Sequence, residues 1–441
     1  MKARLIPVYF EPGRDADFDR QVEALKALLS DRAELLPAVP LGSPLGDADA
    51  VVFPQLLGQA YRRLADFKRI DRPILVVTSE FGTLSMWDWE IIDYLRFEGL
   101  QALAPYTLAQ ARNICSALAV KRELREAKFL VFQDNPGEGA QAGIFKRFYW
   151  WEEECTQRIT RRFGVKIVRE SFKALAEEAR GVSDGQVQEA FPSKKQRFPI
   201  EGLSDRSLHG AIRLYVALRR RLDADPSIRG VGINCLNESH FCDSTPCLAF
   251  AMLFEERGIL WGCEADTVSM LTEYVLGRSL GAPAMVTNLY PFLLGQAALK
   301  HERIDRFPDV EGDPANYLLV AHCGYMGLMP PSFATQWALR PKVLAIVDPN
   351  AVAIDALFPA GKITLAKLHA RMDRLTVAAG ELTGYARYPD SDCRVGGVVR
   401  VGDGHRLMSS LASHHYLLMS GHHRPDIENL GKVFGLAIDQ L

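Results

Sequence analysis

The sequence lacks any long hydrophobic run. None of its segments offers the ~18 or more uninterrupted apolar residues that a transmembrane helix requires. The first residues, MKARLIPVYFEPGRD, have neither a sustained apolar stretch nor a small-residue cleavage site, so they do not have the pattern of a signal peptide. We therefore expect a cytoplasmic protein without a membrane partner.

The sequence also lacks an excess of charge of one sign, internal repeats and low-complexity tracts. Its formal net charge is −2, so no broad basic surface is available for nucleic acid. Hydrophobic residues make up 48% and charged residues 24% of the chain, which is typical of a globular protein with a complete core. With 441 residues, the chain is expected to form two or three domains.

The eight cysteines are not arranged in the closely spaced pairs that zinc ribbons and zinc fingers use. Because no secretory signal precedes them, we expect them to be reduced thiols. One alternative is a zinc site formed by Cys242, Cys247, Cys263 and Cys323. The interpretation that we favour is that these four are small buried hydrophobic residues.

Short apolar runs alternate with helix-like segments over the first two thirds of the chain. Such runs are typical of strands in a parallel sheet that helices cover on both faces. The candidate strands are residues 3–10, 50–54, 73–79, 128–134, 165–171 and 230–236. The pattern predicts two doubly wound α/β units, an N-terminal one at residues 1–125 and a second at residues 126–280.

The last third of the chain is β-rich and contains Gly and Asp-Gly turn signals. Its candidate strands lie in residues 361–370, 374–382 and 394–408. These signals favour an antiparallel, barrel-like domain at residues 281–441. The predicted fold class is therefore α/β, with two doubly wound units followed by a β-rich C-terminal domain.

Two carboxylates follow the apolar run GILW at the seam between a predicted strand and a predicted helix. Asp266 is in a position to cap the helix, which is its simplest interpretation. Glu264 precedes the cap, where the strand ends. In open α/β sheets ligands gather at the carboxyl ends of strands, so Glu264 is a candidate functional residue.

Other polar side chains also follow apolar runs. His322 and Cys323 end one run, and Asn288 ends another. The segment SLASHHYLLMSGHH adds His414 and His415, which strand alternation places on opposite faces, so we expect only one of them to face a site. The recurrence of acid, amide and imidazole groups at strand ends favours a metal site.

Four segments together resemble a known family: CEADTVSMLTEYVLGRSLGAPAMVTN, YLLVAHCG, GKITLAKL and ASHHYLLMSGHHRPDIENLGKVFGL. They are similar, in order, to segments of the L-fucose isomerase and L-arabinose isomerase superfamily, in particular its shorter fucose-isomerase-like members. The likeness spans residues 230–441. It implies an aldose–ketose isomerase that uses Mn²⁺ or another divalent cation, acts on a small-molecule sugar and assembles as a homo-oligomer.

The resemblance also implies roles for individual residues. Glu264 matches the first acidic metal ligand, which also acts as an acid/base group. Asn288 matches the position of the second acidic ligand, and His415 matches the C-terminal His ligand. His414 corresponds to a neighbour that contacts the substrate. His322 lies at a strand end that supplies a ligand in the arabinose branch.

Asn288 is the departure from the family pattern that matters most. Isomerisation moves a proton between C1 and C2 through an ene-diol, and two groups relay the protons. An amide oxygen coordinates a cation but does not act as a general base. We expect Asp266 or His322 to serve as the second base; otherwise the reaction has changed.

Two rival functions follow from this departure. The first is a lyase or transferase that uses a metal-stabilised enediolate on the same scaffold. The second is a sugar-binding protein that has lost the metal. The sequence does not identify the sugar, and the candidates for contacts with its far end are Arg14, Trp87, Trp89, Glu238 and His240.

Overall fold

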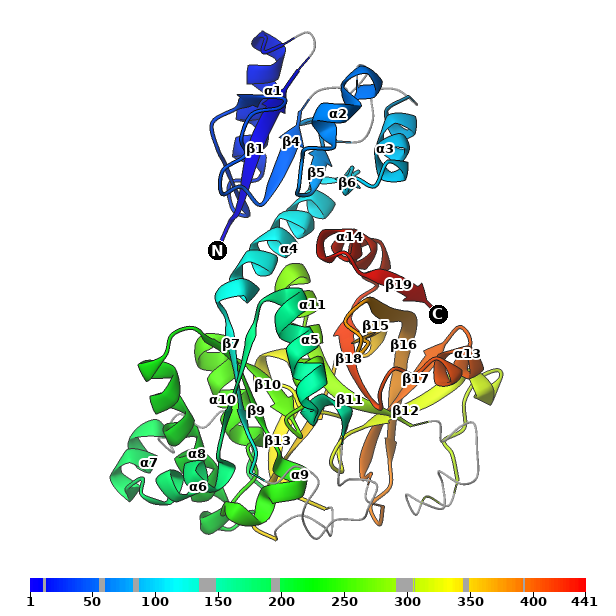
Figure 1. Cartoon of the computed structure of the whole chain (residues 1–441). Coiled ribbons are helices and arrows are strands. Elements are labelled where there is room, and N and C mark those ends of the chain that lie inside the picture. The colour runs from blue at the N-terminus through cyan, green and yellow to red at the C-terminus, as the bar shows by residue number, and fades with distance from the viewer. Residues whose placement is uncertain are drawn as a thin grey trace. The chain divides into compact units, whose positions relative to one another are not determined.

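The chain forms two compact units in the computed structural model (Figure 1). Unit 1 contains Met1–Glu123, Arg278–Gly281 and Pro425–Ala437, and unit 2 contains Leu124–Gly277, Ala282–Arg424 and Ile438–Leu441. The structure describes residues 1–10, 13–54, 60–81, 87–134, 148–191, 199–290, 304, 306–343, 349–391 and 393–441. Within these ranges no helix is both long enough and apolar enough to cross a bilayer.

Unit 1 is built on a parallel sheet with the strand order β2-β1-β4-β5-β6, and β3 pairs with the end of β1. The strands are β1 (Ala3–Tyr9), β2 (Ala33–Leu35), β3 (Val39–Pro40), β4 (Ala50–Phe53), β5 (Ile74–Val76) and β6 (Ala102–Leu103). The helices are α1 (Ala16–Leu28), α2 (Leu64–Phe67), α3 (Trp87–Phe97), α4 (Leu108–Glu126) and α14 (Arg424–Phe434). The C-terminal helix α14 thus returns almost entirely to the unit formed by the N-terminal part of the chain.

Unit 2 begins with a second parallel sheet, of strand order β10-β9-β7-β8. Its strands are β7 (Lys128–Phe132), β8 (Lys166–Glu170), β9 (Ile228–Ile233) and β10 (Leu260–Cys263). Its helices are α5 (Glu153–Phe163), α6 (Phe172–Arg180), α7 (Asp184–Ala190), α8 (Asp205–Ala224), α9 (Cys235–Glu238), α10 (Cys247–Arg257) and α11 (Thr267–Leu280). Helix α8 packs against both α6 and α10.

Glycines let helix α11 approach this sheet closely. The Met270 side chain of α11 fills space that side chains on β9 and β10 would otherwise occupy. A Cβ added at Gly230 would lie 2.7 Å from Met270 Cε, and one added at Gly262 would lie 2.7 Å from Met270 Cγ. Both distances are well below van der Waals contact, so the start of α11 is fixed against the end of β10.

The β-rich part of unit 2 is a closed antiparallel barrel of six strands. The strand order is β15-β18-β11-β12-β17-β16, and pairing between β15 and β16 closes the cylinder. The strands are β11 (Ala284–Tyr290), β12 (Tyr317–Ala321), β15 (Gly361–Leu368), β16 (Arg374–Arg387), β17 (Val395–Val401) and β18 (His415–Ser420). Strand β19 (Ala437–Gln440) adds to β16, and β13 (Gln336–Pro341) and β14 (Val352–Leu357) form a separate hairpin, while short helix α13 (Gly404–Ser409) follows β17.

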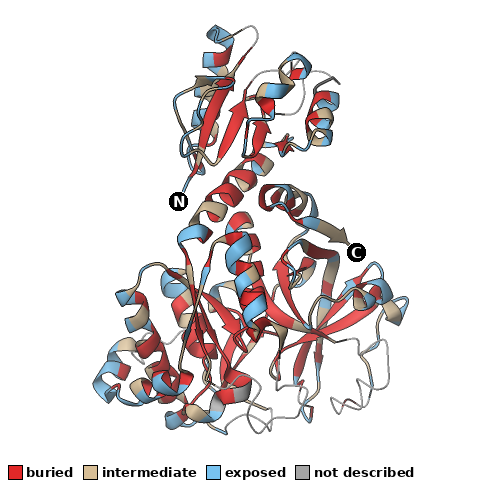
Figure 2. Cartoon of the chain, viewed as in Figure 1, coloured by how far each residue is buried: buried red, intermediate tan, exposed pale blue. Residues whose placement is uncertain are grey.

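The predicted mixture of parallel α/β sheets and an antiparallel, barrel-like C-terminal sheet is confirmed. The strands are largely buried (Figure 2). One hydrophobic cluster includes Leu130 and Val231 of the parallel sheet together with Met285, Leu318 and Leu418 of the barrel. The two segments that we predicted as separate domains, 126–280 and 281–441, therefore share a core within unit 2.

Candidate functional site

The candidate site begins at a tight turn between β10 and α11. Glu264 and Ala265 both have left-handed backbone conformations, with φ of 56° and 55°, and the Asp266 N–H donates to the Cys263 carbonyl at 3.0 Å. Such a conformation costs roughly 1–2 kcal/mol for a residue with a side chain. The indole N–H groups of two tryptophans donate to the Glu264 carbonyl, Trp150 at 3.1 Å and Trp151 at 2.8 Å, and help to hold the turn.

A second turn of the same kind follows β12. The His322 N–H donates to the Tyr325 carbonyl at 2.5 Å, and the Tyr325 N–H donates back at 3.2 Å. Between them Cys323 and Gly324 have φ of 52° and 94°. Three of the five non-glycine residues with positive φ in the described ranges therefore lie in these two turns. Strained backbone of this type is concentrated at functional sites.

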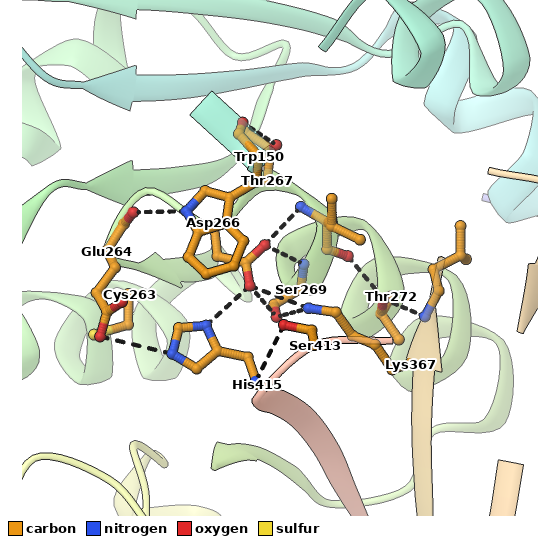
Figure 3. Close-up of polar contacts among 12 residues, drawn as sticks. Trp150, Cys263, Glu264, Asp266, Thr267, Ser269, Thr272, Lys367, Ser413 and His415 are labelled. Atoms are coloured by element: carbon orange, nitrogen blue, oxygen red, sulfur yellow. Dashed lines mark hydrogen bonds and ion pairs between the residues drawn. The ribbon is translucent and has the colours of Figure 1, made fainter. Parts of the chain in front are cut away.

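The carboxylate of Asp266 is the hub of the polar network in Figure 3. Its Oδ1 accepts the backbone N–H groups of Val268 and Ser269, both at 2.9 Å, and so caps α11. Its Oδ2 accepts the Ser269 hydroxyl at 2.7 Å, the Lys367 ammonium at 3.1 Å and His415 Nδ1–H at 2.9 Å. All of these groups are buried.

This environment determines what Asp266 is able to do. Burial by itself would raise the pKa of Asp266, but the Lys367 ammonium and the hydrogen bond from His415 hold it well below its usual range. The carboxylate is thus ionised, and five donors occupy its lone pairs. We therefore interpret Asp266 as a helix cap and a positioning residue. Its predicted role in proton transfer receives no support from these contacts.

The His415 ring lies between two carboxylates. Its Nδ1 bonds to Asp266, and its Nε2 lies 3.6 Å from Glu264 Oε1, without a hydrogen-bond partner. Burial alone would lower the pKa of His415, but the charges of Glu264 and Asp266 raise it to about 9. A carboxylate that holds Nδ1–H while Nε2 is available is the usual arrangement behind a metal-binding histidine.

Glu264 supplies the second unpartnered atom of the site. The residue is 5% exposed, and its Oε2 is buried without a hydrogen-bond partner. Burial would raise the pKa of Glu264, but the neighbouring His415, His414 and His322 together hold it below its ordinary value. The carboxylate is therefore ionised and available to a cation or a proton.

His414 reaches the same place. Potential ligand atoms of Glu264, His414 and His415 all lie within 4.8 Å of one another, which makes them a candidate cation-binding group. Desolvation and the nearby His415 lower the pKa of His414 to about 3, so its imidazole is neutral at neutral pH.

The expectation that only one of the two adjacent histidines faces the site was wrong. Strand β18 begins at His415, whereas His414 lies just before it and is outside the strict alternation of the strand. The His414 carbonyl accepts the Leu289 N–H at 3.1 Å, so its backbone stays close to β11.

Asn288 is brought to the site by strand register. It lies directly opposite His415 on β18 and opposite Ala321 on β12. Residues directly opposite each other in an antiparallel pair present their side chains on the same face, so Asn288 and His415 are neighbours there. Asn288 Nδ2 donates to the Tyr290 hydroxyl at 3.0 Å, and its Oδ1 is buried without a partner.

His322 is close to the site but belongs to a different group of ligand atoms. Its ring centroid lies 5.3 Å from that of His415. One of its ring nitrogens, together with the sulfur atoms of Cys263 and Cys323, forms a group within 4.8 Å. By distance the structure groups His322 with the thiols, although His322 also acts electrostatically on the Glu264 carboxylate.

The candidate substrate contacts are divided between the two units. The Glu238 carboxylate accepts the Asp134 backbone N–H at 2.9 and 3.1 Å, so it anchors the chain after β7. Arg14 belongs to unit 1, where it is exposed and forms an ion pair with Asp19 at 2.7 Å. The side chain of Trp87 lies outside the described part of the structure.

Sequence reasoning missed Lys367 and the two tryptophans. Lys367 is 0% exposed and donates to Asp266 and to Ser269 Oγ, the latter at 2.5 Å. Burial lowers the pKa of Lys367, while the Asp266 carboxylate opposes that effect. A signal was present, since Lys367 stands in the apolar segment ITLAKL, but a lone lysine in a strand is usually at the surface.

Fold and site together define an α/β protein with a closed barrel and a buried carboxylate–imidazole cluster. No family model matches this chain, and no curated protein matches it significantly. The likeness to the isomerase superfamily thus depends on the four sequence segments quoted above.

Proposed function

We propose that this protein is a divalent-cation-dependent aldose–ketose isomerase. The observation that carries the proposal is a set of buried polar atoms without partners: Glu264 Oε2, His415 Nε2 and Asn288 Oδ1. Leaving a buried polar group unpaired costs about 1–3 kcal/mol, so three such atoms in one place favour a ligand that satisfies them. The four resembling segments supply the reaction class.

The residues fit a cation such as Mn²⁺. Glu264 and Asn288 would provide oxygen ligands, and His415 and His414 would provide imidazole nitrogens. This mixture of hard oxygen and imidazole donors suits Mn²⁺. When bound, the cation would supply Lewis-acid stabilisation of negative charge that develops on the sugar oxygens.

The chain's own groups have separate tasks in the proposed reaction. The Glu264 carboxylate removes the proton from C2 of the aldose and returns it to C1, while the hydroxyl proton passes from O2 to O1. Asp266 holds His415 through Nδ1–H, and Lys367 balances the buried charge of Asp266. Trp150 stacks on the His415 ring, with centroids 5.3 Å apart, and limits access of water to it.

Asn288 favours a second candidate function. Its amide does not accept a proton at neutral pH, so the group that would move the hydroxyl proton is not supplied at that position. A lyase or transferase that forms an enediolate needs the cation and one base, and Glu264 and its neighbours meet that requirement. With either function, we propose that the protein assembles as a homo-oligomer. We also propose that helices cover both faces of its parallel sheets.

The test uses the full chain, stripped of metal with a chelator and then supplied with Mn²⁺. We expect uptake of one Mn²⁺ per chain, measured by calorimetry, and Mn²⁺-dependent interconversion within a panel of aldoses and ketoses, followed by NMR. Glu264→Gln should abolish turnover and weaken Mn²⁺ binding. Mn²⁺ uptake without interconversion would favour the second candidate, and absence of uptake would refute both.

A matched control is available on the adjacent helix. Glu273 is also buried, with an unpartnered Oε2, but it belongs to neither group of candidate ligands. Burial raises the pKa of Glu273 well above its ordinary value, which favours the neutral form that glutamine resembles. Glu273→Gln should bind Mn²⁺ and turn over like the wild type. Substantial activity in Glu264→Gln would disprove the role given to Glu264.

A further inference from the structure

Three cysteines meet beside the carboxylate–imidazole cluster. Cys235 is the first residue of α9, after β9, and Cys263 is the last residue of β10. Cys323 lies in the turn after β12. Cys235 and Cys263 are buried, Cys323 is half-buried, and all three are free thiols. Strand ends from the parallel sheet and from the barrel therefore bring sulfur atoms to one place.

The sulfur atoms of Cys263 and Cys323 have the spacing of metal ligands, and the sulfur of Cys235 lies beside that of Cys263. Cys235 Sγ lies 3.5 Å from Cys263 Sγ, and the sulfurs of Cys263 and Cys323 lie with a ring nitrogen of His322 inside a 4.8 Å group. A disulfide would require about 2.05 Å. Tetrahedral Zn²⁺ with Zn–S bonds of about 2.3 Å places its sulfur ligands about 3.8 Å apart. The observed separation is much closer to the second value.

Two independent observations point to a ligand here. His322 is 5% exposed, and its Nε2 is buried without a hydrogen-bond partner. Cys323 has a left-handed backbone with φ of 52°, a strained conformation that holds its side chain in this group.

The charge of the surroundings also suits bound thiolates. The Lys342 ammonium interacts electrostatically with Cys323, with Cys235 and Cys263, and also with Cys247 outside the cluster. One Zn²⁺ with three thiolates carries a net charge of −1, which a single neighbouring ammonium balances. A cation bound with three neutral thiols would instead face the repulsion of that ammonium.

We infer that this protein has a second metal site, for a thiophilic divalent cation with Zn²⁺ as the best match, formed by the group of Cys263, Cys323 and His322 with the neighbouring Cys235 as the fourth ligand. Three cysteines with one histidine is an established ligand set of closed zinc sites. The site is separate from the oxygen–imidazole group of Glu264, His414 and His415. It differs from the four-cysteine set considered from the sequence, because Cys235 and His322 replace Cys242 and Cys247.

The test begins with the reduced, metal-free full chain. Zn²⁺ is titrated in competition with a chromophoric chelator, and we expect one tightly bound Zn²⁺ per chain. Cys263→Ser should weaken binding more than about 100-fold, since even the loss of partners outside the ligand set costs about 10–100-fold. Cys242→Ser, which alters a buried cysteine outside the cluster, should bind as the wild type does. Glu264→Gln should also retain Zn²⁺, which separates this result from the proposed isomerase function.

Two measurements on the wild-type protein test the same site without depending on whether the variants fold. Co²⁺ in place of Zn²⁺ should give intense thiolate-to-metal absorption, which carboxylate and imidazole ligands do not produce. Bound Zn²⁺ should also protect the three cluster cysteines from alkylation, read by mass spectrometry, and leave the reactivity of Cys242 unchanged. Weak Zn²⁺ binding, a Co²⁺ spectrum without thiolate bands, or a disulfide between Cys235 and Cys263 that persists in the reduced preparation would overturn the inference.

Discussion

Replacement of Lys367 by methionine tests the electrostatics of the site most directly. The Lys367–Asp266 ion pair is 3.1 Å long, and both side chains are 0% exposed. Lys367→Met keeps most of the volume of the side chain but removes its charge. Asp266 then remains as a buried carboxylate whose strongest counter-charge has been deleted.

The size of the effect follows from the contacts that remain. Removal of one partner from a buried ion pair typically destabilises a protein by about 3–5 kcal/mol. Asp266 keeps two backbone donors, the Ser269 hydroxyl and the His415 ring. We therefore expect Lys367→Met to lower the free energy of unfolding by about 3 kcal/mol, the lower end of that range. Asp266→Asn should cost more, because Lys367 would keep only Ser269 Oγ among these partners.

The assay is differential scanning calorimetry of the transition that includes unit 2. A loss of this size should lower its midpoint by roughly 5–10 °C. Lys362→Met is the matched control, since Lys362 lies on the same strand but is exposed, and it should leave the midpoint unchanged. In the double variant Lys367→Met with Asp266→Asn, the loss should be smaller than the sum of the single losses by roughly 2–3 kcal/mol.

Two results would refute this reasoning. If the two single losses simply add, Lys367 and Asp266 do not form a coupled buried pair. If Lys367→Met is as stable as Lys362→Met, the Lys367 ammonium does not compensate the charge of Asp266.

The remaining predictions concern ligand charge, close packing and acid stability. Asn288→Asp should raise Mn²⁺ affinity roughly tenfold or more, because it adds a full negative charge; calorimetric titration checks this, and unchanged affinity would place Asn288 outside the metal site. Gly262→Ala should destabilise unit 2 by about 1–3 kcal/mol, because its Cβ would overlap Met270, and an unchanged calorimetric midpoint would contradict that packing. The hydrogen bond from Lys128 lowers the pKa of Asp225 from 3.8 to about 2. Ionised Asp225 therefore stabilises the folded protein fully above pH 3.8, and this contribution is lost as the pH falls through about 2. Asp225→Asn should therefore make the midpoint less dependent on pH in that window, and an equally steep decline would show that Asp225 does not contribute.

Much of the fold and part of the site could be predicted from the sequence. The alternation of short apolar runs with helical segments predicted strands that the structure contains, among them β1, β7 and β15. Glu264 was selected because it follows a strand, and strand ends converge at one edge of a parallel sheet. Asn288 was selected as the end of an apolar run, but it lies within β11 and reaches the site through its pairing with β18. The cap formed by Asp266 follows from local chemistry alone and is also present.

What was not predictable depends on contacts between distant segments. Lys367 pairs with a carboxylate 101 positions away, and no local pattern reports that partner. His414 faces the site because β18 begins one residue later, and strand boundaries are the least predictable feature of a sequence. Similarly, Cys235 was not selected from the sequence, because the strand register that brings it to Cys263 is a property of the folded sheet.

Closure of the barrel has a consequence for how copies of this chain are able to assemble. A sheet that ends in an unpaired strand offers a row of backbone N–H and C=O groups to another chain, whereas the six barrel strands are each paired on both sides. The parallel sheets do end in outer strands, β2 and β6 in one and β8 and β10 in the other. Insertion of a foreign strand between neighbours in the barrel would therefore require hydrogen bonds to break first, and apart from the outer edge of β19, contacts between copies at the barrel are left to side chains.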